Sequence, residues 1–377
     1  MIPTDLKITA ETKVLGMILS SVGNIVDKNN PKPVLNNIKL EAGDSTLMIY
    51  ATDLDISIRA SIATQVIKTG EVTVSGKLLN DIIKKIPDAE VTLEYLIERD
   101  QLAVKTSSCE FILSTLPVKE FPILEYFEYQ HKIAIKSKDL LNLIESTAFS
   151  MSCEETRYNL NGIFIHKNVD GFIEVAATDC HRLALARSNN KIDTHDFGII
   201  IPKKTTDEIV KLLKTTKFDE ITLEISPRLI KFTIGNVILT SKIIEGTFPE
   251  YNNFLPKNNE NILIIDAKIL ADAIDRVSTI NHDKFKAVKL NINSVGIEVW
   301  SFGQFKDAAK ESILLENSCS YSGENLTVGF NPKYLLDILR LFGSELCIIK
   351  FKDAFSSVLI EKHNVSNYQF VVMPIKV

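Results

Sequence analysis

The chain has 377 residues, of which 45% are hydrophobic and 24% are charged, and its formal net charge is −5. This composition is typical of folded domains, and the length is enough for about three domains of ordinary size. A net acidic charge argues against a strongly basic nucleic-acid-binding protein, and because no apolar run approaches about 18 residues, we expect no membrane-spanning helix.

The first third of the chain predicts two amphipathic helices separated by short strands. Apolar residues recur at helical 3-and-4 spacing over 14–22 and again over 78–86, where Lys77 heads the pattern. We prefer a helix to a signal peptide at 14–22, because Asp5 and Glu11 precede it and no small-residue cleavage pattern is obvious. Alternating runs at 38–40 and 47–51 predict strands.

The middle and last thirds predict the same order of elements. Helical spacing returns at 140–144 and 209–213, then at 269–277 and 335–342, and Lys204 and Lys333 head the second helix of each pair. Further strands are predicted at 162–166, 172–177, 288–291 and 296–300.

Short sequence motifs repeat with a spacing of about 126 residues. Thr52-Asp53 returns as Thr178-Asp179, the run 112–115 (Ile-Leu-Ser-Thr) returns as 238–241 (Ile-Leu-Thr-Ser), and Phe-Pro loops follow at 121–122 and 248–249. The third copy closes the chain with the strand 370–374. The repeat predicts an α+β protein of three domains, 1–127, 128–259 and 260–377, each with two helices on antiparallel sheet.

Positive charge gathers on the second helix of each repeat. The segments 75–86, 202–217 and 331–343 hold ten basic and four acidic residues, whereas the first helices hold six of each. If the helices share one face, that face suits contact with nucleic-acid phosphates without sequence readout. The alternative is that these lysines only solvate helix surfaces.

Catalytic and metal-binding patterns are scarce. The five cysteines are odd in number and show no Cys-x-x-Cys spacing, so we expect reduced thiols in the cytosol. The six histidines have no metal-ligand spacing, and no phosphate-binding loop or nucleophile elbow is present. Asp179, Cys180 and His181 contain the elements of a thiol catalytic site, but neighbours in an extended chain point to opposite faces, so we expect no catalysis there.

Several short sequence motifs, in a fixed order over nearly the whole length of the chain, carry a resemblance to a known family. They are Thr178-Asp179-x-His181-Arg182-Leu183-Ala184, Arg157-Tyr158-x-Leu160-Asn161-Gly162, Phe248-Pro249-x-Tyr251 with Leu255-Pro256, Lys284-Phe285, Ser356-Ser357-Val358 and the terminal Val371-Val372-Met373-Pro374. With these words and three repeats, the chain resembles the β subunit of bacterial DNA polymerase III, the sliding-clamp family.

The resemblance implies a fold and a function. It implies a head-to-tail homodimer whose six domains close a ring, with helices lining the hole and duplex DNA passing through without sequence readout. It implies a processivity subunit with no catalytic activity, cofactor or metal of its own, in the cytoplasm at the nucleoid. The implied partners are the polymerase catalytic subunit, the clamp loader, repair polymerases and mismatch-repair or ligase proteins, all bound through short peptides, and no membrane.

The resemblance also implies three groups of site residues. A peptide-binding groove would be formed by Leu160, Thr178, His181, Arg182, Leu183, Pro249, Phe254, Tyr334, Phe355, Ser357, Val371, Val372, Met373, Pro374 and Ile375. DNA-facing residues would be Lys77, Lys84, Lys85, Arg157, Tyr158, Lys203, Lys204, Lys211 and Lys333. The dimer interface would set Phe111 and Leu113 against Ile280.

The chain departs from the family pattern at several positions. Cys180 stands where the family usually has glycine, Asn159 where an aromatic residue is common, and Asn253 where a basic residue is frequent. A basic residue of some relatives is missing from the loop 29–33, and the tail ends in Ile-Lys-Val at 375–377. Two rival classes remain open at this point: a non-catalytic repeat scaffold that does not encircle DNA, and a metal-dependent hydrolase with an ion at Asp179.

Overall fold

The computed structural model describes residues 5–23, 25, 31–122, 128–281, 287–303, 307–316 and 319–376. The chain divides into two compact units, Met1–Lys138 with Asp207–Ile243, and Asp139–Thr206 with Ile244–Val377. Each unit combines parts of two sequence repeats. The pair Lys284-Phe285, residues 29 and 30 of the loop 29–33, and the last residue, Val377, lie outside the described residues.

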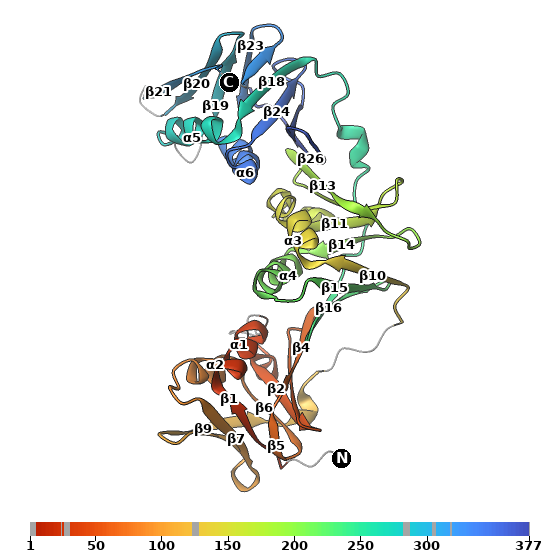
Figure 1. The fold of residues 1–377 in the computed structure, drawn as a ribbon, viewed down its shortest axis with the longest axis vertical. Coiled ribbons are helices and arrows are strands. Elements are labelled where there is room, and N and C mark those ends of the chain that lie inside the picture. The colour runs from red at the N-terminus through yellow and green to blue at the C-terminus, as the bar shows by residue number, and fades with distance from the viewer. Residues whose placement is uncertain are drawn as a thin grey trace. The chain divides into compact units, whose positions relative to one another are not determined.

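The first unit holds two helices and one large sheet (Figure 1). Its elements are α1 (Thr12–Val22), α2 (Gly76–Ile83), β1 (Lys7–Glu11), β2 (Asn37–Gly43), β3 (Thr46–Thr52), β4 (Ile56–Ala63), β5 (Gln65–Lys68), β6 (Gly70–Ser75), β7 (Glu90–Leu96), β8 (Gln101–Lys105), β9 (Glu110–Leu116), β10 (His131–Lys136), β15 (Glu220–Ile225), β16 (Leu229–Ile234) and β17 (Val237–Lys242).

One antiparallel sheet of 13 strands runs through this unit, in the order β10-β15-β16-β17-β4-β3-β2-β6-β9-β8-β7-β1-β5. The pairing of β17 with β4 sets Leu239 opposite Ile58 and joins the second repeat to the first without a break in the sheet. Helices α1 and α2 pack on each other and on strands of this sheet. Strand β4 buries every second residue, from Ile56 to Ile62, as expected for a strand covered on one face.

The second unit holds two sheets. Its elements are α5 (Ala267–Ser278), α6 (Pro332–Phe342), β11 (Gly162–Lys167), β12 (Phe172–Thr178), β13 (Arg182–Lys191), β14 (Gly198–Pro202), β18 (Asn261–Asp266), β19 (Val288–Ile292), β20 (Gly296–Phe302), β21 (Ala308–Leu314), β22 (Ser320–Ser322), β23 (Leu326–Phe330), β24 (Leu346–Phe351), β25 (Val358–Lys362) and β26 (Val365–Val372). The helices α3 (Ser137–Glu145) and α4 (Lys203–Thr215) each contain a boundary between the units.

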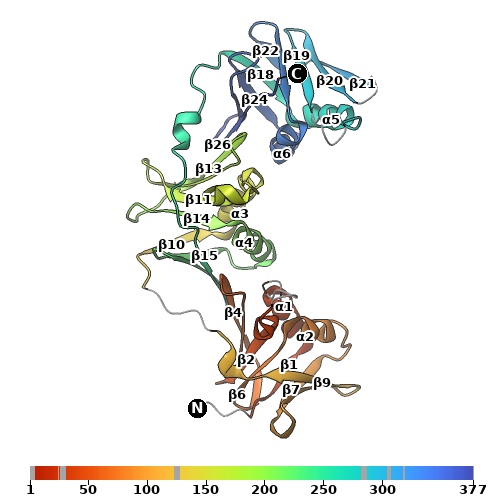
Figure 2. The same cartoon turned by 180° about the vertical axis from the view of Figure 1, so that it is seen from behind.

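The larger sheet of the second unit again joins two repeats. Its order is β14-β11-β12-β13-β26-β25-β24-β18-β22, and the smaller sheet has the order β21-β20-β19-β23. Strand β26 pairs with β13 so that Phe370 lies opposite Ala184 (Figure 2 shows these two strands from behind). In the described residues β21 pairs only with β20, so its other edge carries no strand.

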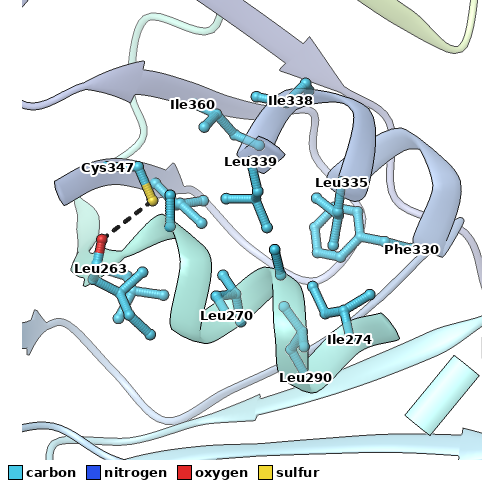
Figure 3. Close-up of a cluster of buried hydrophobic side chains, with 14 of the residues drawn as sticks. Leu263, Leu270, Ile274, Leu290, Phe330, Leu335, Ile338, Leu339, Cys347 and Ile360 are labelled. Carbon is cyan, nitrogen blue, oxygen red and sulfur yellow. Dashed lines mark hydrogen bonds between the residues drawn. The ribbon is translucent and has the colours of Figure 1, made fainter. Parts of the chain in front are cut away.

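Helices α5 and α6 pack side by side over the core of the third repeat (Figure 3). Leu270 and Ile274 of α5 meet Leu335 and Leu339 of α6, and all four side chains are almost fully buried. Asp266 caps α5 by accepting the N–H groups of Lys268 and Ile269. Asn331 caps α6 by accepting the N–H of Lys333, with Pro332 at the first helical position. Local capping and the apolar stripe therefore determine where both helices begin.

The predicted fold class, α+β with three repeated units, is confirmed, and so are six helices and the strands named from the sequence. Helix α2 is shorter than predicted, because it ends at Ile83 and not at Ile86. Pro87 follows Ile86, and the residue before a proline disfavours helical backbone, so the helix does not continue through Ile86. The Ile86 N–H still donates to the Ile82 carbonyl at 3.2 Å in a single turn.

The last strand of each repeat, called its closing strand, is β9, β17 or β26. The predicted spacing of 126 residues is wrong for these strands. Thr73, Ile200 and Gly329 each lie three residues before the second helix of their repeat. They bridge to equivalent partners, Leu116, Ile244 and Ile375 respectively. Phe111, Leu239 and Phe370 lie five positions before Leu116, Ile244 and Ile375 respectively, so these three residues are equivalent.

The physical reason for the shift is that two segments differ in length between the first and second repeats. Leu223 lies three residues farther from the start of α4 at Lys203 than its counterpart Leu93 lies from the start of α2 at Gly76. The hairpin that follows offsets only two of these three residues. Leu93 pairs with Val104 across the hairpin of β7 and β8, whereas the equivalent Leu223 pairs with Phe232 across β15 and β16. The first loop therefore has two more residues, which include a 3₁₀ turn at Ile97–Arg99. The similar motifs at 112–115 and 238–241 are therefore not equivalent in the fold, because their positions in the closing strands differ by two residues.

Candidate functional site

Every residue predicted for the groove belongs to the second unit, and the groove starts at the turn that joins β12 to β13. The Thr178 hydroxyl donates to the Arg182 carbonyl at 2.6 Å and accepts the Cys180 N–H at 3.1 Å. One oxygen of Asp179 accepts the N–H groups of His181 at 2.9 Å and of Arg182 at 3.0 Å. Threonine and aspartate side chains thus replace the backbone partners that the turn lacks.

Cys180 occupies left-handed backbone, with φ of 73°. Glycine adopts this region without the steric cost that a Cβ brings, so the cysteine side chain strains the backbone here. The equivalent turn of the first repeat has the same hydrogen bonds from Thr52 and Asp53, and Leu54 there has φ of 81°. Both turns therefore hold a strained residue.

Arg182 anchors this turn to the third repeat. Its side chain is 6% exposed and donates to Asp179 at 3.0 Å and to Asp337 of α6 at 2.6 Å, with a further bond to the Phe149 carbonyl. The guanidinium also lies 4.5 Å from the centre of the Tyr334 ring. Burial, followed by the nearby Asp179 charge, raises the pKa of Tyr334.

This network shows what the Arg182 side chain does within the predicted groove. With every side of its guanidinium engaged, Arg182 fixes the wall of the groove and the position of Tyr334 rather than offering a free charge to a ligand. Sequence reasoning missed Asp337 and Phe149, because the residues that meet at Arg182 lie on separate elements.

Apolar side chains predicted for the groove pack together, and their cluster is called the floor below. Leu160, Leu183 and Val371, all predicted, lie in one buried cluster. The cluster also includes Phe248, Tyr251 and Leu359, which were not predicted as groove residues. Val372 is fully buried on the neighbouring core, so it supports the floor from below.

A polar group of three side chains fixes Tyr251 beneath this floor. The Tyr251 hydroxyl donates to Glu174 and lies 2.7 Å from His166 Nε2. Burial, together with the Glu174 carboxylate, raises the pKa of Tyr251 far above its ordinary value. The Phe-Pro-x-Tyr motif pointed to Tyr251, but nothing in the sequence indicated that Glu174 and His166 would contact it.

The rim of the groove carries exposed apolar side chains. Phe254, Phe355, Met373 and Ile375 are 63%, 78%, 50% and 37% exposed respectively. Pro249, Ser357 and Pro374 are half-buried, and His181 is exposed.

Phe355 is presented by its own turn. Asp353 accepts the N–H groups of Phe355 at 2.8 Å and of Ser356 at 2.7 Å, and these bonds lower the pKa of Asp353. An ordered loop with an exposed aromatic side chain can contact a ligand without first losing much conformational freedom.

A buried apolar floor with an exposed apolar rim and a few polar groups suits a short extended peptide with hydrophobic anchors. Chemistry on a bound molecule is not supported. Both oxygens of Asp179 accept hydrogen bonds from its own turn, and the described residues show no bond between the side chains of Cys180 and His181. Within the described ranges, no group of three His, Cys, Asp or Glu side chains could hold a metal ion.

The two other departures from the family pattern have plain structural roles. Asn159 donates to the Thr247 carbonyl at 2.9 Å and so ties η5 (Glu155–Leu160) to the loop that leads to Phe248. Asn253 is exposed in η6 (Tyr251–Phe254), next to Phe254 on the rim.

All residues predicted to face DNA are exposed. Lys77 belongs to α2, Lys84 and Lys85 follow it, Lys203, Lys204 and Lys211 belong to α4, Lys333 belongs to α6, and Arg157 and Tyr158 belong to η5. Lys211 lies 2.6 Å from Glu208, and Arg157 lies 3.3 Å from Glu154. The Arg157 pair is solvent-accessible and weak, whereas the Glu208 side chain is only 9% exposed. Lys211 and Arg157 are themselves exposed, so both cations can still contact a phosphate.

The residues predicted for the dimer interface lie on two elements. Phe111 and Leu113 occupy β9, where Phe111 is 37% exposed and Leu113 is 5% exposed. Ile280 lies just after α5 and is half-buried. In the described residues β9 pairs with β8 along its length and with β6 only at Thr115 and Leu116, so most of its second edge carries no strand.

No helix in the described part of the chain is long and apolar enough to cross a membrane.

Comparison with protein families matches the whole chain in three consecutive parts. Family models of the DNA polymerase III beta subunit match residues 6–125 (N-terminal domain), 134–250 (central domain) and 252–376 (C-terminal domain).

Individual relatives show the same likeness. The chain is 41% identical to the beta sliding clamp of Rickettsia bellii, over 99% of this chain and 100% of that protein, and 33% identical to that of Caulobacter vibrioides with the same coverage. Among solved structures, a sliding clamp (DNA polymerase III subunit beta) from Bartonella birtlesii bound to griselimycin superposes with a TM-score of 0.93 at 31% identity, covering 99% of this chain and 100% of that one. DNA polymerase III subunit beta from Pseudomonas aeruginosa gives 0.92 at 29% identity, covering 98% and 100% respectively.

Proposed function

The chain belongs to the DNA polymerase III beta subunit family, the sliding clamps, and we propose that two copies close head to tail around duplex DNA and hold the polymerase there through the groove of the second unit. As a sliding clamp it is the processivity subunit of DNA polymerase III and carries no catalytic centre of its own. The hydrolase alternative is set aside on the geometry of Asp179.

The observation that carries the ring is the repeated strand pairing. β17 pairs with β4, and β26 pairs with β13, so each junction between repeats continues a sheet. The strand that pairs with a closing strand at each junction, β4 or β13, is called the receiving strand, and β21 is its counterpart in the third repeat. Among the described residues, the closing strand β9 has no partner on its second edge before Thr115, and β21 has none on its outer edge. A head-to-tail contact that repeats and closes makes a ring, and two three-repeat chains supply six junctions.

Exposed lysines and one arginine on or near the second helices would face the DNA. Those predicted are Lys77, Lys84, Lys85, Lys203, Lys204, Lys211, Lys333 and Arg157, with Tyr158 beside Arg157. Contacts of this kind reach phosphates and not base edges, so the ring would hold DNA without sequence preference. A closed ring stays on DNA by topology, and weak contacts allow it to slide. An acidic chain can therefore serve as a DNA tether.

The groove would take peptide tails from several partners in turn. The polymerase catalytic subunit, the clamp loader, repair polymerases and mismatch-repair or ligase proteins would compete for Phe254, Phe355 and the segment 371–375 around the floor cluster. Cys180 adds a side chain at this wall, so peptide preference in this chain would differ from that of relatives with glycine.

The repeat boundaries proposed from the sequence are 1–127, 128–259 and 260–377, and they fall close to the limits of the three family matches. We place the protein at the nucleoid in the cytoplasm, where a ring on chromosomal DNA would act.

The test is retention on DNA circles after loading with a matching clamp loader and ATP. We expect the protein to stay on a nicked circle and to leave when the circle is linearised, because the ring then slides off an end. Equal retention on both forms would indicate ordinary surface binding and refute topological linkage. Failure to load on either form would favour a scaffold that does not encircle DNA.

A further inference from the structure

We propose that the junction between the first two repeats holds a second binding site, a cavity that takes one small apolar molecule carrying a carboxylate. All residues that line this cavity belong to the first unit, and its volume is about 1220 Å³, which is ample for a small molecule. Helix α1 and the segment after α2 line it from the first repeat, and α4 with the hairpin of β16 and β17 lines it from the second. The site goes beyond the proposed function, which makes no use of the cavity.

The equivalent place at the junction between the second and third repeats is nearly filled. The cavity there has a volume of only about 280 Å³. The first helices of the two repeats begin at Thr12 and Ser137, so Met17 of α1 is equivalent to Asn142 of α3. Met17 lines the large cavity and Asn142 lines the small one, which shows that the two cavities correspond.

A difference in one side chain accounts for part of the extra space. Val237 and Tyr368 lie seven positions before the bridge residues Ile244 and Ile375, so they are equivalent. Each lies opposite an alanine of its receiving strand, and each lines its cavity. A small apolar side chain thus stands at the first junction where the second junction has a large aromatic one.

The wall of the large cavity is mostly apolar. Its apolar side chains include Met17, Ile18, Ile83, Leu212, Ile234 and Val237. Met17 is 56% exposed, and Phe218, which also lines the cavity, is 48% exposed. An apolar ligand would remove these surfaces from water, which favours binding.

One end of the cavity offers hydrogen-bond donors. Thr12 lines it, is 7% exposed, and has a hydroxyl without a hydrogen-bond partner among the described residues. Thr12 is also the first residue of α1, whose N-cap Glu11 makes no side-chain hydrogen bond and whose first turn contains no acid. The N–H groups at the start of a helix attract anions, so a carboxylate at this end would be recognised by the helix and by the hydroxyl.

The charges around the cavity also favour an anion. Of the three acids on its lining, Glu208 lies 2.6 Å from Lys211, and Asp88 accepts hydrogen bonds from two serines, which leaves Glu11. Three further lysines line the cavity and make no ion pair in the part of the chain that the structure describes: Lys13, Lys84 and Lys217. Phosphates of DNA would reach exposed lysines too, but charged phosphates would not enter an apolar cavity.

The test is calorimetric titration of the full chain with decanoate and with decanol, which has the same apolar tail and no charge. We expect one decanoate to bind per chain, and decanol to bind about tenfold more weakly, because the alcohol lacks the charge that the α1 N-terminus and the lysines attract.

Variants locate the bound molecule. Val237→Tyr introduces the side chain of the equivalent Tyr368 and should weaken decanoate binding about tenfold by filling the cavity. Met17→Asn introduces the residue of the equivalent Asn142 at an exposed position and should weaken both probes. Val169→Tyr is the matched control, because Val169 is fully exposed and lies outside the cavity.

Thr12→Val keeps the shape of the side chain and removes the hydroxyl, so it should weaken decanoate more than decanol. Circular dichroism during thermal unfolding shows which variants are folded, and Met17→Asn decides the question if Val237→Tyr does not fold.

No binding of decanoate to the native chain at millimolar concentration would overturn the site. Equal decanoate affinity in the native chain and in the folded cavity variants would place the molecule elsewhere and would overturn it as well. Equal affinity for decanoate and decanol would refute recognition of a carboxylate. None of these outcomes depends on loading onto DNA, so the proposed function stands or falls separately.

Discussion

Replacing Arg182 with alanine is expected to destabilise the second unit strongly. The change removes the one cation held between Asp179 and Asp337, at 3.0 Å and 2.6 Å, and the donor to the Phe149 carbonyl. The two carboxylates would then lie close together in the groove wall without a counter-charge.

The size of the effect follows from burial. Breaking a buried ion pair by removing one partner costs about 3–5 kcal/mol. The Asp179 and Asp337 side chains are 16% and 27% exposed, so water can partly solvate them, and we expect the lower end, about 3 kcal/mol. Lost stacking of the guanidinium on Tyr334 adds roughly 0.5–1 kcal/mol.

Urea-induced unfolding measures this loss, and Trp300 is a convenient probe because it is the single tryptophan of the chain and belongs to the second unit. Arg157→Ala is the matched control, because Arg157 pairs with Glu154 at the surface and its removal should cost less than about 1 kcal/mol. Adding Asp337→Asn to Arg182→Ala should restore about 1 kcal/mol, since it removes one uncompensated charge. A loss for Arg182→Ala no larger than that of the control would refute this reasoning.

Four further outcomes are expected. Removal of residues 373–377 should abolish binding of a polymerase-tail peptide in fluorescence anisotropy while light scattering still shows the dimer, and undiminished affinity would contradict the assignment of the tail to the groove. Reversing the charge of Lys203 and Lys204 should shorten retention on nicked circles severalfold, and unaltered retention would mean that these lysines do not face the hole. Cys180→Gly should raise the unfolding free energy by roughly 0.5 kcal/mol, because glycine relieves the left-handed strain at the cost of a more flexible unfolded chain; a measured decrease would show that the side chain packs favourably. The Asp353 pKa is lowered from 3.8 by hydrogen bonds to its ionised form, so its turn is fully stabilised above that pH and loses this stabilisation as pH falls below it. Peptide affinity of the native chain should therefore drop in that acidic range, and it should change less in Asp353→Asn. Identical pH profiles for the two proteins would refute the link.

The helices and most strands were predictable because their signals are local. Helical 3-and-4 spacing around Leu15, Leu140 and Leu270, and alternation along β4, depend only on which face each segment buries. The floor of the groove was partly predictable for the same reason, since Leu183 and Val371 belong to clearly apolar strands.

The contacts that fix the groove were not predictable, because they join distant parts of the chain. Arg182 and Asp337 are 155 positions apart, and Tyr251 and Glu174 are 77 apart. Composition and periodicity carry no information on such pairs. Arg182 therefore looked like a residue that meets the ligand, although its guanidinium is engaged within the wall.

The prediction of which closing-strand residues correspond between repeats failed for a different reason. Similar motifs at 112–115 and 238–241 favoured one alignment, but the strand pairing shows that their positions differ by two residues, because the segments between the second helix and the closing strand differ in length. Loop lengths vary freely between repeats, whereas strand pairing cannot, so only the ladders show which residues correspond.

The junction between repeats has a consequence for any attempt to study one repeat in isolation. An excised central repeat would carry the edge of β13 that receives β26 and the edge of β17 that meets β4. These two edges resemble the two halves of one junction, so copies of a single repeat can join head to tail. If the junctions keep the geometry proposed for the ring, the expected product is a closed ring of six single repeats, and linking three repeats on one chain reduces the number of pieces that must assemble from six to two.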